Sequence, residues 1–179
     1  MKNRLLQTII VVVLLAGTIW VVWDHFLNHT PPVVVGRPAP DFELMLMDGG
    51  TITLKELRNR PVLINFWATY CPSCIDEMPA IESVYQAYRD QGFIVVGINT
   101  GESMAAIQGY VRRTGVTYPI ALDPDAKAQK AYKVYDLPRS VFIDADGNVA
   151  VDHIGEMNAP MVENFLIQTI ARRNAAKIE

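Results

Sequence analysis

The pattern of apolar and polar positions predicts strands and helices that alternate along most of the chain. Two near-continuous apolar runs of strand length, 62–66 and 93–98, are typical of central parallel strands buried on both faces. Between them, apolar residues of 72–89 recur at intervals of three and four, and this spacing predicts a helix.

Turn residues and shorter periodic runs predict the remaining elements. In chain order they are a hairpin over 41–53, a helical turn over 54–58, a helix over 102–114, a strand over 118–122, a helical turn over 123–132, a hairpin of strands 140–144 and 149–153, and a final helix over 158–174. This order predicts an α/β fold with a central mixed sheet flanked by helices and an N-terminal β-hairpin.

The N-terminal residues carry the longest apolar run. Leu5 to Trp23 is nineteen residues without a charge, with Lys2 and Arg4 before it and Asp24 after it. At ~1.5 Å per residue a helix of this length spans about 28 Å, close to the ~30 Å hydrocarbon core of a bilayer. The positive-inside rule then predicts a cytoplasmic N-terminus and a domain on the periplasmic side of the membrane.

A cleaved signal peptide is the alternative interpretation of this run. Its apolar region usually has ~7–15 residues and ends in small residues at the cleavage site. The run here is longer, and bulky residues occupy 20–26. We therefore expect residues 1–27 to form a cytoplasmic tip and a single uncleaved transmembrane helix.

Length and composition predict how the rest of the chain is organised. The 179 residues allow one domain of ordinary size plus an appendage. Prolines in 28–40 predict a stiff extended linker, so the domain is expected over 41–179. The net charge is −3 and the domain has no basic cluster, which argues against binding to nucleic acid.

The chain contains two cysteines, Cys71 and Cys74, at the start of the predicted helix 72–89. Unpaired N–H groups and the helix dipole favour an anion at this end of a helix, so a thiolate there has a lowered pKa. The spacing predicts a dithiol–disulfide exchange site in which Cys71 attacks and Cys74 resolves the mixed disulfide. A purely structural disulfide would gain little from closing so short a loop, and a structural zinc ion needs about four ligands.

Several motifs resemble those of a known family. They are the run 65–74, Asn-Phe-Trp-Ala-Thr-Tyr-Cys-Pro-Ser-Cys, then Glu77-Met78-Pro79, the opening 35–42 with Leu44 and Asp48-Gly49, Leu137-Pro138 before 140–144, and Gly155. Over about residues 34–170 the chain resembles the thioredoxin superfamily, in its membrane-anchored, redoxin-type branch of TlpA-like and ResA-like proteins. The resemblance implies a thioredoxin-like fold and a redox-active Cys71–Cys74 disulfide, with no further cofactor.

The resemblance also implies where a client binds. It gives the Leu137-Pro138 peptide bond a cis geometry, which leaves the backbone of Leu137 free to pair with an extended client beside the cysteines. Pro138 is thus expected in the active site. Trp67, Tyr70 and Pro72 are expected, with Leu137, at the client-binding surface; Tyr70 stands where the family usually has a tryptophan.

Asn65 departs from the pattern of cytoplasmic thioredoxins, which carry a buried aspartate at this position. Another group must then manage the proton of Cys74. Glu77 lies one helical turn after Cys74 and is the residue expected to do so; the alternative is that Glu77 is an exposed helix acid.

Together these features predict an extracytoplasmic thiol–disulfide oxidoreductase, and the resemblance implies that it acts as a disulfide reductase. The resemblance implies protein clients such as apocytochrome c and electrons from a transmembrane donor protein. The protein is expected to be a monomer. One alternative is an oxidase that donates disulfides. Another is a copper-binding module of Cys71, Cys74 and His153, since thiolates suit Cu(I). The simpler interpretation of His153, at the end of a hairpin strand, is a surface residue. Peroxidase activity is not expected, because Ile64 and Ala68 replace a Pro-x-x-x-Thr pattern.

Overall fold

The computed structural model describes residues 2–27 and 33–176 and divides the chain into two units, Met1–Pro31 and Pro32–Glu179. Residues 28–32 of the predicted linker lie outside the described residues. In the first unit, α1 (Lys2–Leu27) is a helix whose side chains from 10 to 20 are all exposed. Among the described residues, no helix combines the length and apolar character needed to cross a bilayer, so the transmembrane helix stays a prediction.

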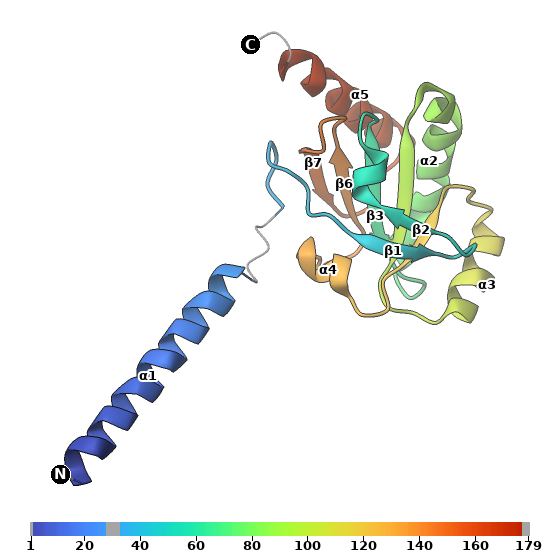
Figure 1. Ribbon diagram of the computed structural model, residues 1–179. Helices are drawn as coiled ribbons and strands as arrows, with labels where there is room; N and C mark the ends of the chain where they lie inside the picture. Colours follow the sequence, from blue (N-terminus) through green and yellow to red (C-terminus); the bar gives the residue numbers. More distant parts are fainter. Residues whose placement is uncertain (1, 28–32, 177–179) are drawn as a thin grey trace. The chain divides into compact units, whose positions relative to one another are not determined.

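The second unit is built on one seven-stranded sheet with the strand order β2-β1-β5-β4-β3-β6-β7 (Figure 1). The strands are β1 (Glu43–Leu46), β2 (Thr51–Thr53), β3 (Val62–Trp67), β4 (Ile94–Asn99), β5 (Ile120–Leu122), β6 (Arg139–Ile143) and β7 (Val149–Ile154). Strands β3, β4 and β5 run parallel, and the other pairs are antiparallel. The predicted mixed sheet and N-terminal hairpin are confirmed.

The most apolar predicted strand, β3, is an interior strand of this sheet. All six residues of β3 are buried, and β3 pairs with β4 on one side and β6 on the other. A strand covered on both faces has no polar side, which explains the continuous apolar run at 62–66.

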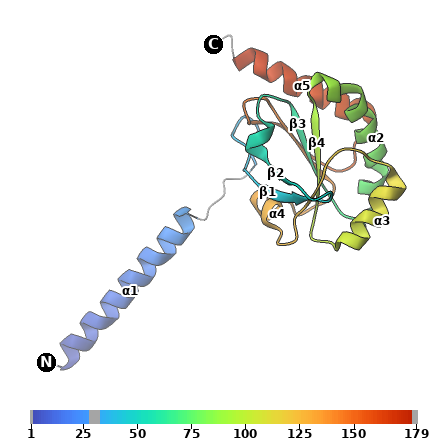
Figure 2. The ribbon, with the colours of Figure 1, turned by 45° about the vertical axis from the view of Figure 1, so that its right-hand side comes forward.

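Helices cover both faces of the sheet (Figure 2). They are α2 (Pro72–Tyr88), α3 (Met104–Thr114), α4 (Lys127–Ala131) and α5 (Ala159–Ala176), with the short 3-10 turns η1 (Leu54–Leu57) and η2 (Arg89–Gln91). Residues of α2, α3 and α5 pack in one buried cluster, which also contains both cysteines. Residues of η1 and α4 pack in a second cluster on the other face.

Several predicted boundaries are shifted; the helical turn expected over 123–132, for example, is α4 over Lys127–Ala131. The helix expected over 102–114 begins at Met104, because Ser103 is the N-cap and its hydroxyl accepts a hydrogen bond from the N–H of Ala106 at 3.4 Å. The strand expected from 118 begins at Ile120, because Pro119 has no N–H to donate to the sheet.

Candidate active site

Helix α2 begins at the two cysteines, which form a disulfide bond. Cys71 is the N-cap, and Pro72 occupies the first turn, where the missing proline N–H leaves no hydrogen bond unmade. The Sγ of Cys71 accepts a hydrogen bond from the N–H of Cys74 at 3.2 Å. The same donor and the helix dipole favour a thiolate on Cys71 once the disulfide is reduced.

The two cysteines differ in burial. Cys71 is 7% exposed, whereas Cys74 is 0% exposed. A client disulfide can approach Cys71 from solvent, whereas Cys74 is enclosed and out of its reach. This agrees with the expected order, in which Cys71 attacks and Cys74 resolves.

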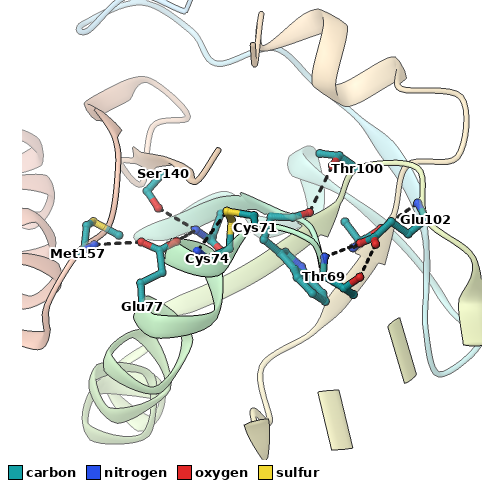
Figure 3. Close-up of a disulfide and its surroundings, with 11 residues drawn as sticks. Thr69, Cys71, Cys74, Glu77, Thr100, Glu102, Ser140 and Met157 are labelled. Carbon is teal, nitrogen blue, oxygen red and sulfur yellow. Dashed lines mark hydrogen bonds between the residues drawn. A yellow bond between two sulfur atoms is a disulfide. The ribbon is translucent and has the colours of Figure 1, made fainter. Parts of the chain in front are cut away.

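Glu77 is a buried acid, so the alternative of an exposed helix acid is wrong. Its Oε1 accepts a hydrogen bond from Asn65 Nδ2 at 2.7 Å, and its Oε2 accepts one from the N–H of Met157 at 3.1 Å (Figure 3). Burial raises the pKa of Glu77 from 4.5 to about 7, although these two hydrogen bonds oppose the rise. The site therefore holds a carboxyl group that exchanges its proton near neutral pH, one turn after Cys74.

Asn65 links this acid to the sheet. Its amide nitrogen donates to Glu77 and also to the hydroxyl of Ser140 at 3.0 Å, and Ser140 is its cross-strand partner in β6. Among the described residues, the Asn65 Oδ1 atom has no hydrogen-bond partner. Two acceptors thus fix the orientation of the amide and keep its N–H groups on the carboxyl side.

The predicted cis bond between Leu137 and Pro138 is confirmed. The Pro138 carbonyl accepts a hydrogen bond from Gly155 at 2.9 Å, and Leu137 packs against the cluster that contains the cysteines. Within the described part of the chain, no hydrogen bond involves the backbone of Leu137. Its N–H and C=O are therefore available to an added strand.

The three residues expected with Leu137 at the client-binding surface differ in exposure. Tyr70 is 71% exposed and Pro72 is exposed, so both can meet a client. Trp67 is completely buried and packs on Tyr110 with ring centroids 5.4 Å apart. The expectation for Trp67 is corrected: the indole supports the site from within the core and offers no surface to a client.

Glu102 belongs to the site, although the sequence pattern did not single it out. Its Oε2 accepts hydrogen bonds from the N–H of Thr69 at 2.6 Å and from Asn99 Nδ2 at 2.8 Å, and its Oε1 accepts one from the Thr69 hydroxyl at 2.5 Å (Figure 3). The carboxylate thereby holds the loop that leads from β3 to Cys71. One signal was available: the ends of adjacent parallel strands meet at one sheet edge, and Glu102 follows the end of β4 as Thr69 follows the end of β3.

His153 lies in β7, where it pairs in register with Ser140 and contacts the ring of Phe165 at 5.4 Å between centroids. It is half-buried, not the surface residue its position suggested. Over the described ranges, no three histidine, cysteine or acidic residues lie close enough to hold a metal ion. The structure therefore does not bring His153 together with Cys71 and Cys74 as a copper site.

A mixed sheet, a disulfide at the start of the helix after its central strand, and a cis-proline before the next antiparallel strand define a thiol–disulfide oxidoreductase with a thioredoxin-like fold. The comparisons with known proteins agree. The model of the AhpC/TSA family matches residues 35–151. The thiol-disulfide oxidoreductase ResA of Bacillus thuringiensis (strain Al Hakam) is 32% identical over 166 residues, which cover 92% of this chain and 96% of that protein.

Two further relatives extend this agreement. ResA of Geobacillus kaustophilus is 33% identical over 165 residues, covering 92% of this chain and 95% of that protein. A crystal structure of a thiol:disulfide interchange protein of the thioredoxin family from Chlorobium tepidum TLS superimposes with a TM-score of 0.69 at 27% identity, covering 74% of this chain and 95% of that one. The chain belongs to the AhpC/TSA family and is a thiol–disulfide oxidoreductase of the ResA type.

Proposed function

We propose that this protein is an extracytoplasmic reductase that passes two electrons from its two thiols to disulfides in client proteins. The observation that carries the proposal is the unequal burial of the cysteines: Cys71, at the start of α2, keeps a small exposed area of 7%, whereas Cys74, one turn before Glu77, is completely enclosed. An accessible nucleophile backed by an enclosed resolving thiol suits a protein that makes a mixed disulfide and then releases its client.

The proposed cycle starts from the reduced protein. The Cys71 thiolate attacks one sulfur of the client disulfide, which forms a Cys71–client bond and releases the other client sulfur as a thiolate. Cys74 gives its proton to Glu77 and attacks Cys71 Sγ. The Cys71–Cys74 bond forms, the second client sulfur leaves as a thiolate, and the client has gained two electrons. A transmembrane donor protein would return two electrons to the disulfide.

Glu77 suits the role of proton acceptor because its pKa of about 7 lies close to neutral pH. An ordinary glutamate would be too weak a base to take a thiol proton, whereas burial strengthens this one. The N–H of Met157 and the amide of Asn65 then stabilise the carboxylate when it is ionised.

The reductive direction and the place in cytochrome c maturation come from the resemblance to ResA-like proteins. A redox titration tests the direction, since a potential near ~−120 mV is that of an oxidant and one well below ~−200 mV that of a reductant. The extracytoplasmic location is supported by the uncharged run from Leu5 to Trp23 and by the exposed apolar residues of α1. Reporter fusions after residue 30, active only outside the cytoplasm, test the location.

Trapping in cells tests the proposed function directly. Cys74→Ser leaves the mixed disulfide without a resolving thiol, so clients should accumulate bound to Cys71 and be identified after non-reducing capture. Cys71→Ser is the matched control and should trap none. Apocytochrome c among the captured proteins would support the maturation role; no captured client would refute protein disulfide reduction.

A further inference from the structure

The loop before the cis-proline contains a stretch of open backbone. Over the described residues, no hydrogen bond involves the backbone of Tyr135, Asp136 or Leu137, which we call the open strip. The side chain of Tyr135 is 86% exposed. Although these three residues make no backbone hydrogen bonds of their own among the residues that the structure describes, neighbouring residues hold the strip at both ends.

On its C-terminal side, the strip is held by the Pro138 carbonyl, which accepts the N–H of Gly155. On its N-terminal side, Arg139 holds it. The Arg139 Nη1 atom donates to the carbonyl of Lys133 at 2.7 Å, although Arg139 itself lies after the cis-proline. The guanidinium therefore closes the loop 133–139 on itself.

A buried ion pair fixes this guanidinium. Arg139 Nε and Nη2 donate to the two carboxylate oxygens of Asp152 in β7, at 2.9 and 2.7 Å. The Arg139 side chain is only 11% exposed and the Asp152 side chain 21%. A two-pronged arginine–carboxylate contact has a defined geometry, unlike the single-point contact of a lysine. Arg139 is thus rigid, and it ties the loop to the edge strand of the sheet.

We propose that Arg139 is a positioning residue for client recognition. It holds the open strip in a fixed shape, so that an extended client segment next to the disulfide pairs with the strip by adding a strand. Because the strip is held before the client arrives, the client does not have to order it on binding. The proposal rests on the proposed function that the clients are proteins, and it predicts that Arg139 matters for polypeptide disulfides and not for small ones.

The test compares two disulfides as substrates of the reduced full-length protein: a synthetic peptide with a cystine, and hydroxyethyl disulfide, which has no backbone to pair. Arg139→Lys keeps the charge beside Asp152 but loses the two-pronged contact. We expect the second-order rate constant for the peptide to fall about tenfold, the factor that ~1.4 kcal/mol of lost binding gives. The rate constant for hydroxyethyl disulfide and the reduction potential should not change.

Two more variants guard against a general loss of folding. The double variant Arg139→Met, Asp152→Leu removes both charges together, so no buried charge is left unpaired, and it should show the same selective loss. Glu82→Gln is the control: Glu82 accepts hydrogen bonds from the N–H and hydroxyl of Thr117 at 2.8 and 2.7 Å, away from the open strip. It should leave the ratio of the two rate constants unchanged.

Hydrogen exchange provides a second readout. The N–H groups of Lys133 and Val134 are bonded to the carbonyls of Lys130 and Gln129, and they should exchange faster in Arg139→Lys than in wild type. An equal loss of both rate constants, or no loss of either, overturns the role of Arg139. A wild-type protein that reduces neither disulfide refutes the proposed function itself, which is a separate outcome.

Discussion

Replacing Glu77 by glutamine should change how folding stability depends on pH. Burial raises the pKa of Glu77 from 4.5 to about 7 in the folded protein, whereas the unfolded chain keeps the ordinary value. Between these values the folded state holds a proton that the unfolded state has lost, so wild-type stability falls as pH rises. At ~1.4 kcal/mol for each pH unit, the loss amounts to about 3 kcal/mol and is complete once the pH exceeds the folded pKa.

Glutamine cannot ionise, so Glu77→Gln escapes this loss. It does lose one acceptor for the N–H of Met157, which costs about 1 kcal/mol at every pH. Urea unfolding of the oxidised proteins between about pH 4 and about pH 8 measures both the pH-dependent loss of stability in wild type and the constant cost of the lost hydrogen bond in the variant. The variant should be slightly less stable than wild type at the acidic end and more stable at the alkaline end, and the curves should cross between them.

Glu82→Gln, on the same helix, is the control because its shift has the opposite sign. Partial burial opposes ionisation of Glu82, but hydrogen bonds from Thr117 and Gln86 outweigh it and lower its pKa. Wild type should therefore gain stability over Glu82→Gln as pH rises through the acid range. Parallel stability curves for wild type and Glu77→Gln would refute the reasoning, because they would mean that burial does not raise the pKa of Glu77.

Two further changes test the catalytic assignments. If Glu77 accepts the proton of Cys74, Glu77→Gln should slow release of the client from the mixed disulfide. It should also remove the pH dependence of this step near pH 7, as measured by stopped-flow thiol exchange. An unchanged pH profile of the release rate would assign Glu77 a structural role. Glu102→Ala removes the three hydrogen bonds that Thr69 and Asn99 donate to the Glu102 carboxylate, so the Cys71 loop should loosen and the first attack should slow about tenfold. Glu56→Ala, in η1, should leave the rate unchanged.

Local patterns were enough to predict most of the fold. The period of three and four in α2 and the apolar run of β3 arise from burial of one helix face and of both strand faces, and both are visible in a single sequence. The misplaced starts of α3 and β5 both had local signals: Ser103 is a common N-cap residue, and Pro119 cannot donate a hydrogen bond to the sheet. What the sequence could not reveal are contacts between distant segments, such as the hydrogen bond from the N–H of Thr69 to the Glu102 carboxylate, 33 residues later.

The same limit applied to the site. The spacing of Cys71 and Cys74 is local and predicted the disulfide chemistry. Glu77 follows Cys74 by three residues and precedes Ile81 by four, so its place on the buried stripe of α2 could have been read from the sequence. The role of Arg139 could not be predicted from the sequence. Its partner Asp152 lies on the neighbouring antiparallel strand, diagonally opposite Arg139, and this contact depends on the strand register, which is not evident from the sequence.

Asn65 and Glu77 are best understood as one feature. Asn65 Nδ2 lies 2.7 Å from Glu77 Oε1, so an aspartate at position 65 would bring two carboxyl groups into contact. Such groups share a proton, and their titrations couple. A neutral amide avoids the repulsion and supplies an N–H donor that stabilises the single carboxylate. The departure from the thioredoxin pattern therefore does not remove the buried acid: the acid lies on α2, and β3 provides the group that holds it.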